Sequence, residues 1–360
     1  MSEPVWAVVM AGGVGARFWP MSRLERPKQF LSIFGDEPLL VESVRRLRGL
    51  VQPRHTLIVT SALHVERTRE LLPEVPEENI LGEPAGRNTA ACVALAAAVI
   101  RQRQASARVV VLPADHYVGD AEEFRTTLER ALTACQGGHL VTLGIRPDRP
   151  ETGYGYIQHS EGELAPGVHG VRTFAEKPNR ETALLFLRSG DFLWNAGIFV
   201  WENEALVEAL ESWLPETWEA LEGLAESLHE PAGREALTQA YLGLRSVSID
   251  VAVMEPAGRV PGKVRVVRAT FPWNDVGTWA EIHRMLPRDG EGNSTQGEAL
   301  FVASRNCHVQ AGRRTVVLLG MQDAIVVDTP DALLVCSMAR HQDLPLVIQR
   351  LKEEGLHELL

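Results

Sequence analysis

The sequence predicts an α/β fold that is followed by a run of short β-strands. Two observations predict it: β-branched apolar runs alternate with helix-spaced segments over residues 6–143, and evenly spaced short apolar runs follow residue 296. The chain has 360 residues, a length typical of about two domains. Its 45% hydrophobic and 23% charged residues are ordinary for a globular protein.

Expected strands and helices alternate along the first part of the chain. Because a helical segment follows each apolar run, the pattern indicates a parallel sheet with helices on both faces. Asn88 or Thr89 is expected to cap the third helix. The expected strands are 6–10, 56–60, 108–112 and 140–143, and the expected helices are 39–50, 63–72, 88–103 and 122–135.

The remaining sequence divides into a mixed region and a region of short strands. Residues 152–267 contain two expected strands and several helices, which is typical of an insertion that completes a substrate cleft. The short apolar runs after residue 296 fit either a small barrel or a β-helix. The polar segment 287–296 marks the expected boundary between domains 1–287 and 288–360. The expected elements are strands 154–159, 168–174, 299–303, 307–310, 315–319, 324–327 and 332–336, with helices from Arg180 and Asn203, over 204–241 and at 344–352.

Composition excludes several classes of protein. The 36 Lys and Arg residues against 47 Asp and Glu give a net charge of −11, which disfavours nucleic-acid binding. The four cysteines lack metal-clip or redox spacing. No segment approaches 18 apolar residues, so we expect no membrane span and a reducing, cytoplasmic location.

A glycine-rich loop follows the first expected strand. Backbone amides of such a loop can approach a phosphate closely. Phe18 stands where a dinucleotide fingerprint needs a third glycine, and the sequence lacks the Gly-Lys-Ser/Thr of a P-loop. Two cations follow the loop, and Lys28 is one of only four lysines in the chain. The candidate phosphate-binding residues are Ala11, Gly12, Gly13, Gly15, Arg17 and Lys28.

This segment resembles the signature of the sugar-1-phosphate nucleotidyltransferases. The match consists of Gly12-Gly13-x-Gly15-x-Arg17, Pro20-Met21-Ser22-Arg23 and Pro27-Lys28-Gln29-Phe30, with Met21 where members usually have leucine. The resemblance implies a Rossmann-like, GT-A-like domain with a mixed central sheet. It also implies that a small left-handed β-helix forms the C-terminal domain.

Further matches implicate the nucleotide base and a metal ion. The segment 82–89 resembles the base-facing segment of guanylyltransferases, in which Glu83 can accept hydrogen bonds from guanine N1–H and the exocyclic amine. Arg87 lies at an expected helix N-terminus, where phosphate binding is favoured. Asp115 and Asp275 match the two metal carboxylates of the family, a donor set that suits Mg²⁺. The resemblance implies nucleotide binding by Glu83, Pro84, Arg87, Asn88 and Thr89.

Three other segments match the sugar-phosphate side of the family. Glu176 can accept from sugar hydroxyls, and Lys177 can contact the phosphate. Taken alone, Glu176-Lys177-Pro178 is typical of a surface turn and Asn195-Ala196-Gly197 of a loop. The resemblance implies that the sugar phosphate is bound by Gly153, Tyr154, Glu176, Lys177, Asn195 and Gly197.

The implied reaction uses GTP and mannose 1-phosphate and yields GDP-mannose and pyrophosphate. A sugar-phosphate oxygen attacks the α-phosphorus in line, Mg²⁺ is the expected cofactor, and Arg17 and Lys28 are the expected catalytic residues. The family also suggests a homodimer. Two alternatives stay open: a nucleotidyltransferase of the glucose or thymidylyl type, and a non-catalytic sugar-nucleotide-binding regulatory subunit.

Overall fold

The computed structural model describes residues 4–13, 15–104, 106–228 and 230–360. These residues form two compact units. Unit 1 comprises Met1–Gly12, Ser43–Ala114 and Val118–Trp273, and unit 2 comprises Gly13–Glu42, Asp115–Tyr117 and Asn274–Leu360. The units therefore interleave along the chain, and the division into 1–287 and 288–360 stays a prediction.

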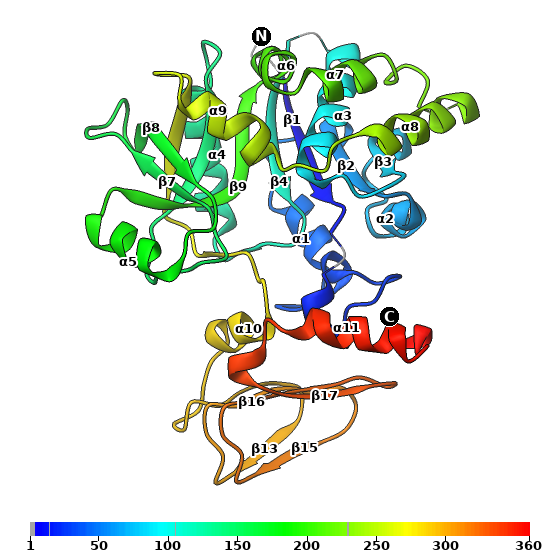
Figure 1. The fold of residues 1–360 in the computed structure, drawn as a ribbon, viewed down its shortest axis with the longest axis vertical. Helices are drawn as coiled ribbons and strands as arrows, with labels where there is room; N and C mark the ends of the chain where they lie inside the picture. Colours follow the sequence, from blue (N-terminus) through cyan, green and yellow to red (C-terminus); the bar gives the residue numbers. More distant parts are fainter. Residues whose placement is uncertain (1–3, 14, 105, 229) are drawn as a thin grey trace. The chain divides into compact units, whose positions relative to one another are not determined.

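Unit 1 is built on a mixed sheet, which within the described residues has nine strands (Figure 1). Its strands are β1 (Val5–Ala11), β2 (Thr56–Ser61), β3 (Ile80–Glu83), β4 (Arg108–Pro113), β6 (Leu140–Ile145), β7 (Tyr156–His159), β8 (Val168–Ala175), β9 (Phe192–Glu202) and β10 (Val264–Ala269). They lie in the order β3-β2-β1-β4-β9-β6-β10-β8-β7. β3, β2, β1 and β4 are parallel, whereas β9 runs antiparallel to β4, β6 and β7.

Helices cover this sheet. The middle of the helix 88–103 is rich in alanine and fully buried, so it packs closely against β1 and β2 and against two later helices. In the described part of the chain, no helix is long and apolar enough to cross a membrane. The helices of unit 1 are α2 (Val65–Leu71), α3 (Asn88–Arg103), α4 (Ala121–Ala134), α5 (Arg180–Ser189), α6 (Asn203–Trp213), α7 (Pro215–Glu222), α8 (Pro231–Gly243) and α9 (Glu255–Gly258). The helix α1 (Leu39–Arg45) crosses from unit 2 into unit 1, and α10 (Trp279–Met285) and α11 (Leu344–Glu353) belong to unit 2.

Unit 2 contains the short C-terminal strands. These are β12 (Ser294–Gln296), β13 (Ala299–Val302), β14 (His308–Gln310), β15 (Val316–Leu319), β16 (Ala324–Asp328) and β17 (Leu333–Ser337). β12, β14 and β16 stack in parallel, and so do β13 and β15. Repeated parallel stacking of successive turns is the pattern of a β-helix, so the barrel alternative is wrong. The two-residue strands β5 (Tyr117–Val118) and β11 (Trp273–Asn274) pair separately.

The expected fold class is confirmed, with corrections to individual elements. The expected parallel sheet is correct only as far as β4, because β9 enters antiparallel beside it. The expected loop Asn195-Ala196-Gly197 lies inside β9. The expected capping role of Asn88 or Thr89 is wrong, since Arg87 is the N-cap residue of α3 and makes no side-chain cap bond. The first helix, expected to reach residue 50, ends at Arg45.

Candidate functional site

The glycine loop holds its backbone against Lys28. Gly15 has φ of 60°, and a Cβ on it would lie 2.5 Å from Lys28 Cβ, so only glycine fits this position. Ser22 Oγ donates to the Gly15 carbonyl over 2.8 Å, which fixes the turn. Ala11 ends β1, Gly12 and Gly13 are exposed, and Val14 lies outside the described residues.

Lys28 is a buried cation that contacts both residues predicted to supply metal carboxylates, Asp115 through its side chain and Asp275 through its backbone. Its ammonium donates to Asp115 Oδ2 over 2.9 Å and to the Asp275 backbone carbonyl over 2.6 Å. The Lys28 side chain is 7% exposed, and that of Asp115 is 33% exposed. Burial opposes ionisation of Asp115, but attraction to Lys28 and then to His116, together with hydrogen bonds, outweighs burial and holds the pKa of Asp115 below its usual range. Two segments far apart in the sequence therefore meet at one ammonium.

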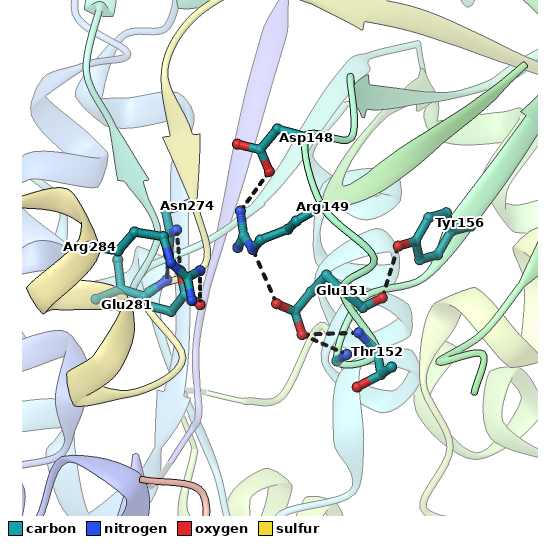
Figure 2. Close-up of polar contacts among 10 residues, drawn as sticks. Asp148, Arg149, Glu151, Thr152, Tyr156, Asn274, Glu281 and Arg284 are labelled. Carbon is teal, nitrogen blue, oxygen red and sulfur yellow. Dashed lines mark hydrogen bonds and ion pairs between the residues drawn. The ribbon is translucent and has the colours of Figure 1, made fainter. Parts of the chain in front are cut away.

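The Asp275 turn is braced by a buried glutamate. Asn274 Oδ1 accepts from the Val276 amide over 2.6 Å, which stabilises the positive φ of 50° at Val276. Asn274 Nδ2 in turn donates to Glu281 Oε2 over 3.0 Å, and Arg284 donates to Glu281 Oε1 over 2.6 Å (Figure 2). The side chain of Glu281 thus fixes the backbone that presents Asp275.

Asp115 and Asp275 are the two carboxylate residues that the sequence predicts to hold a metal ion. Among the described residues, no group of three or more His, Cys, Asp or Glu side chains is placed to hold a metal. Magnesium nevertheless binds commonly through one or two carboxylates together with substrate phosphates and water, so a two-carboxylate set suits it. Both carboxylates come from residues that share the Lys28 ammonium.

Glu83 is a second buried charged group, in unit 1. It ends β3 and is 7% exposed. Its Oε1 accepts from the Tyr241 hydroxyl over 3.2 Å, and a Cβ on Gly12 would lie 2.9 Å from its Oε2. Burial raises the pKa of Glu83 to about 7, although the hydrogen bond from Tyr241 opposes the shift. The charge of this carboxyl group therefore changes near neutral pH.

The segment after Glu83 is held by local contacts. Arg87 Nε donates to the Tyr241 carbonyl over 2.6 Å and Nη2 to the Leu242 carbonyl over 3.0 Å. Asn88 Oδ1 accepts from the Thr89 amide over 2.8 Å. Thr89 Oγ1 accepts from a backbone amide of the 249–254 turn over 2.9 Å, and Pro84 is half-buried. Two donors of Arg87 are thus used within the protein.

Asn195 stands at the centre of the predicted sugar side. Its Nδ2 donates to Asp250 Oδ1 over 2.6 Å, and its Oδ1 accepts from Thr142 Oγ1 and the Gly197 amide, each over 3.1 Å. Burial, followed by repulsion from Glu176, raises the pKa of Asp250 to about 6. Asp250 begins a π-helix, Asp250–Met254, a distortion that is frequent at functional sites.

Glu176 and Lys177 lie near this cluster. Lys177 Nζ is 3.0 Å from Glu176 Oε1, and the Lys177 side chain is 63% exposed. A Cβ on Gly155 would lie 2.8 Å from Glu176 Oε2 and 3.5 Å from Asn195 Cβ. The absence of a side chain at Gly155 therefore leaves room for the Glu176 carboxylate, with Asn195 close by.

A charged loop shapes the neighbouring Gly153 and Tyr154. Arg149 pairs with Asp148 over 2.9 Å and with Glu151 over 3.3 Å (Figure 2). Glu151 Oε1 accepts from the Gly153 amide over 3.1 Å. The Arg149 guanidinium also lies over the rings of Trp194 and Tyr154, at 4.7 and 5.9 Å. Gly153 and Tyr154 were predicted as site residues from the family resemblance. The charged residues of this loop, Asp148, Arg149 and Glu151, were not predicted.

Comparison with known proteins identifies the family. The nucleotidyl transferase model matches residues 6–291, and the mannose phosphate isomerase/GMP-like β-helix model matches residues 297–351. The mannose-1-phosphate guanylyltransferase of Escherichia coli K12 is 36% identical over 98% of this chain and 75% of its own. This chain belongs to the nucleotidyl transferase family, with the mannose-1-phosphate guanylyltransferases. The family resemblance of the sequence is confirmed.

Two further relatives agree with this assignment. The alginate biosynthesis protein AlgA of Pseudomonas aeruginosa is 35% identical over 98% of this chain and 73% of its own. A crystal structure of a mannose-1-phosphate geranyltransferase from Thermus thermophilus is 36% identical and has a TM-score of 0.87, with 97% of this chain and 99% of that one covered. The match to the Thermus thermophilus structure therefore extends over both the nucleotidyl transferase part and the β-helix part of this chain.

Three groups of predicted site residues emerge from the structure. Gly15, Lys28, Asp115 and Asp275 are brought together in unit 2. In unit 1, Gly12 approaches Glu83, and Tyr241 contacts both Glu83 and Arg87. Glu176 and Asn195 also lie close together in unit 1, both beside Gly155, a residue that was not predicted as part of the site. Arg17 is exposed and has no hydrogen bond or ion pair among the described residues.

Proposed function

We propose that this protein transfers GMP from GTP to mannose 1-phosphate, giving GDP-mannose and pyrophosphate. The observation that carries the proposal is the Lys28 ammonium between Asp115 and the Asp275 backbone, in a chain of the guanylyltransferase family. In-line attack on phosphorus requires positioning and charge neutralisation more than covalent chemistry. The sugar phosphate is already anionic near neutral pH, so the attack needs no general base.

Lys28 and Arg17 are the proposed catalytic residues. Lys28 has three N–H donors, and Asp115 and Asp275 accept from two of them, which leaves one for a phosphate oxygen. Arg17 is exposed and has a fork of donors available for the triphosphate. The amides of Gly12, Gly13 and Gly15 supply further donors without the obstruction of a side chain.

The base and the sugar have separate proposed sites. Glu83 is proposed to accept from guanine, with Pro84, Arg87, Asn88 and Thr89 shaping that segment. Arg87 donates to two backbone carbonyls of the protein, so these contacts support a role in holding the segment in place rather than in binding phosphate. Glu176 and Asn195 are proposed to bind sugar hydroxyls and Lys177 the sugar phosphate, with Gly153, Tyr154 and Gly197 forming the surrounding backbone.

Magnesium is the proposed cofactor, held by the Asp115 and Asp275 carboxylates. Nucleotidyl transferases generally use a divalent metal. Bound there, the ion would neutralise charge on the phosphates. The Lys28 ammonium keeps Asp115 ionised, which is the protonation state that a metal ligand requires.

Pyrophosphate release by the purified protein with Mg²⁺ tests the proposal. The assay combines GTP, ATP, dTTP and UTP with mannose 1-phosphate and glucose 1-phosphate. We expect the highest kcat/KM with GTP and mannose 1-phosphate. Faster release with another pair would replace the proposed substrates, and folded protein that binds GTP without any release would indicate a regulatory subunit.

Asp115→Asn and Asp275→Asn are expected to weaken the use of magnesium. Each removes one anionic ligand, so the Mg²⁺ concentration for half-maximal turnover should rise about tenfold or more. Turnover is measured against Mg²⁺ concentration at fixed GTP, with Asp343→Asn, which alters an exposed carboxylate just before α11, as the matched control. Unchanged titrations in both variants would rule out this metal site.

The remaining predictions concern organisation and partners. We propose that domains 1–287 and 288–360 form the catalytic and β-helix parts, and that the protein acts as a homodimer in the cytoplasm. We propose no nucleic-acid or membrane partner, in keeping with the net charge of −11.

A further inference from the structure

Tyr241 contacts both charged residues of the proposed base-binding segment. It lies fully buried near the end of α8, and its hydroxyl donates to Glu83 Oε1 over 3.2 Å. Its carbonyl accepts from Arg87 Nε over 2.6 Å. One residue therefore holds Glu83 through its side chain and Arg87 through its backbone.

The Glu83 carboxylate is enclosed by three elements. Gly12 approaches it from the end of β1, Cys92 faces it from α3, and Tyr241 faces it from α8. The pKa values of Cys92 and Tyr241 both lie well above their ordinary values, chiefly because of burial, so both groups are neutral near pH 7. Of the donors in the described residues, the Tyr241 hydroxyl is the one that reaches Glu83.

We propose that Tyr241 is a positioning residue for guanine, whose hydroxyl orients the Glu83 carboxylate and favours its ionised form. This inference rests on the proposed use of GTP. Guanine presents two neighbouring hydrogen-bond donors on its Watson–Crick edge, N1–H and the 2-amino group. An ionised carboxylate offers two acceptor oxygens to them. Each carboxylate oxygen has two lone pairs, so Oε1 can accept from Tyr241 and from the base together.

Protonation of Glu83 would work against this recognition. A carboxylic acid carries a hydrogen on one oxygen and would face the donors of guanine with a donor of its own. A hydrogen bond to the ionised form favours that form, so the Tyr241 hydroxyl opposes the effect of burial. Removing the hydroxyl should therefore weaken GTP binding most at the pH where Glu83 titrates.

Tyr241→Phe tests the proposal because it keeps the ring and both backbone contacts of Arg87. Pyrophosphate release is measured from pH 5.5 to 9 with GTP and with inosine 5′-triphosphate, which lacks the 2-amino group. We expect KM for GTP to rise about tenfold near pH 7. The ratio of kcat/KM for GTP to that for inosine triphosphate should fall, and the pH midpoint of KM should rise, while kcat changes less.

The matched control is Tyr156→Phe. It also removes the hydroxyl of a fully buried tyrosine, which donates to the Glu151 carbonyl over 2.9 Å. The nucleotide ratio and the pH midpoint should not change in this variant. Thermal melting of both variants separates a loss of folding from a loss of recognition.

A double variant provides the second test. Glu83→Gln removes the carboxylate through which Tyr241 is proposed to act. Adding Tyr241→Phe to Glu83→Gln should therefore have almost no further effect on the ratio of kcat/KM for GTP to that for inosine triphosphate. If Tyr241→Phe has an equal effect in the unaltered protein and in Glu83→Gln, the proposal is overturned. It is also overturned if Tyr241→Phe alone changes neither the nucleotide ratio nor the pH midpoint of KM. If the unaltered protein does not prefer GTP over inosine triphosphate, the proposed guanine recognition itself fails.

Discussion

Lys28→Met is expected to lower kcat for pyrophosphate release by about 10²–10³-fold, the usual effect of removing one charge-stabilising donor. Methionine keeps the length of the side chain but removes the ammonium that joins Asp115 to the Asp275 backbone. Without that charge, burial should raise the pKa of Asp115 and disfavour its ionised form. Turnover is measured at saturating GTP and mannose 1-phosphate, together with thermal melting.

The stability cost of Lys28→Met should be smaller than its catalytic cost. Breaking a fully buried ion pair costs about 3–5 kcal/mol, but the Asp115 side chain is one-third exposed, so water compensates part of its charge. Arg314→Met is the matched control, because it leaves the buried Asp328 carboxylate of β16 without its guanidinium. We expect that variant to lose stability and keep its turnover. A Lys28→Met protein that is less stable but fully active would exclude Lys28 as a catalytic residue.

Local sequence patterns pointed to Gly15, Lys28 and Asp115, which lie close together in the structure. Gly15 and Lys28 belong to one short signature, and the close approach of their backbones explains why glycine stands there. Asp115 follows a strand whose carboxyl end could be placed from its apolar run. The association of Asp275 with these residues came from family resemblance, because nothing in its local sequence indicates a partner more than 150 positions away.

The residues that support the site were not predictable in the same way. Asp250 and Tyr241 lie at the start or end of helical segments, and neither belongs to a pattern that indicates their partners Asn195 and Glu83. β9 was missed because Asn195-Ala196-Gly197 is typical of a loop, whereas pairing with β4, β6 and β7 imposes an extended backbone on it. Such contacts depend on the tertiary fold, so they became visible only in the structure.

Glu83→Gln is expected to reduce kcat/KM for GTP by about 100-fold, because the amide nitrogen presents donors to the donors of guanine. Recognition of GTP over ATP should weaken, and the change in KM for GTP around pH 7 should disappear with the titrating group. These constants are measured for both nucleotides from pH 5.5 to 9. If the variant keeps its preference for GTP and its pH dependence, Glu83 does not bind the base.

The same substitution should stabilise the protein at high pH. Burial raises the pKa of Glu83 from 4.5 to about 7, so between these values the folded state binds more protons than the unfolded state. Stability therefore falls as pH rises through this range, by up to about 3 kcal/mol at pH 8. Glu83→Gln removes this cost, so its gain in Tm should be absent at pH 4 and largest at pH 8.

Glu281→Gln is the matched control, because that equally buried glutamate is paired with Arg284 and its loss should lower Tm at pH 8. A gain in Tm for Glu83→Gln alone would mean that the buried carboxyl group of Glu83 lowers the stability of the folded protein, at the position where guanine is proposed to bind.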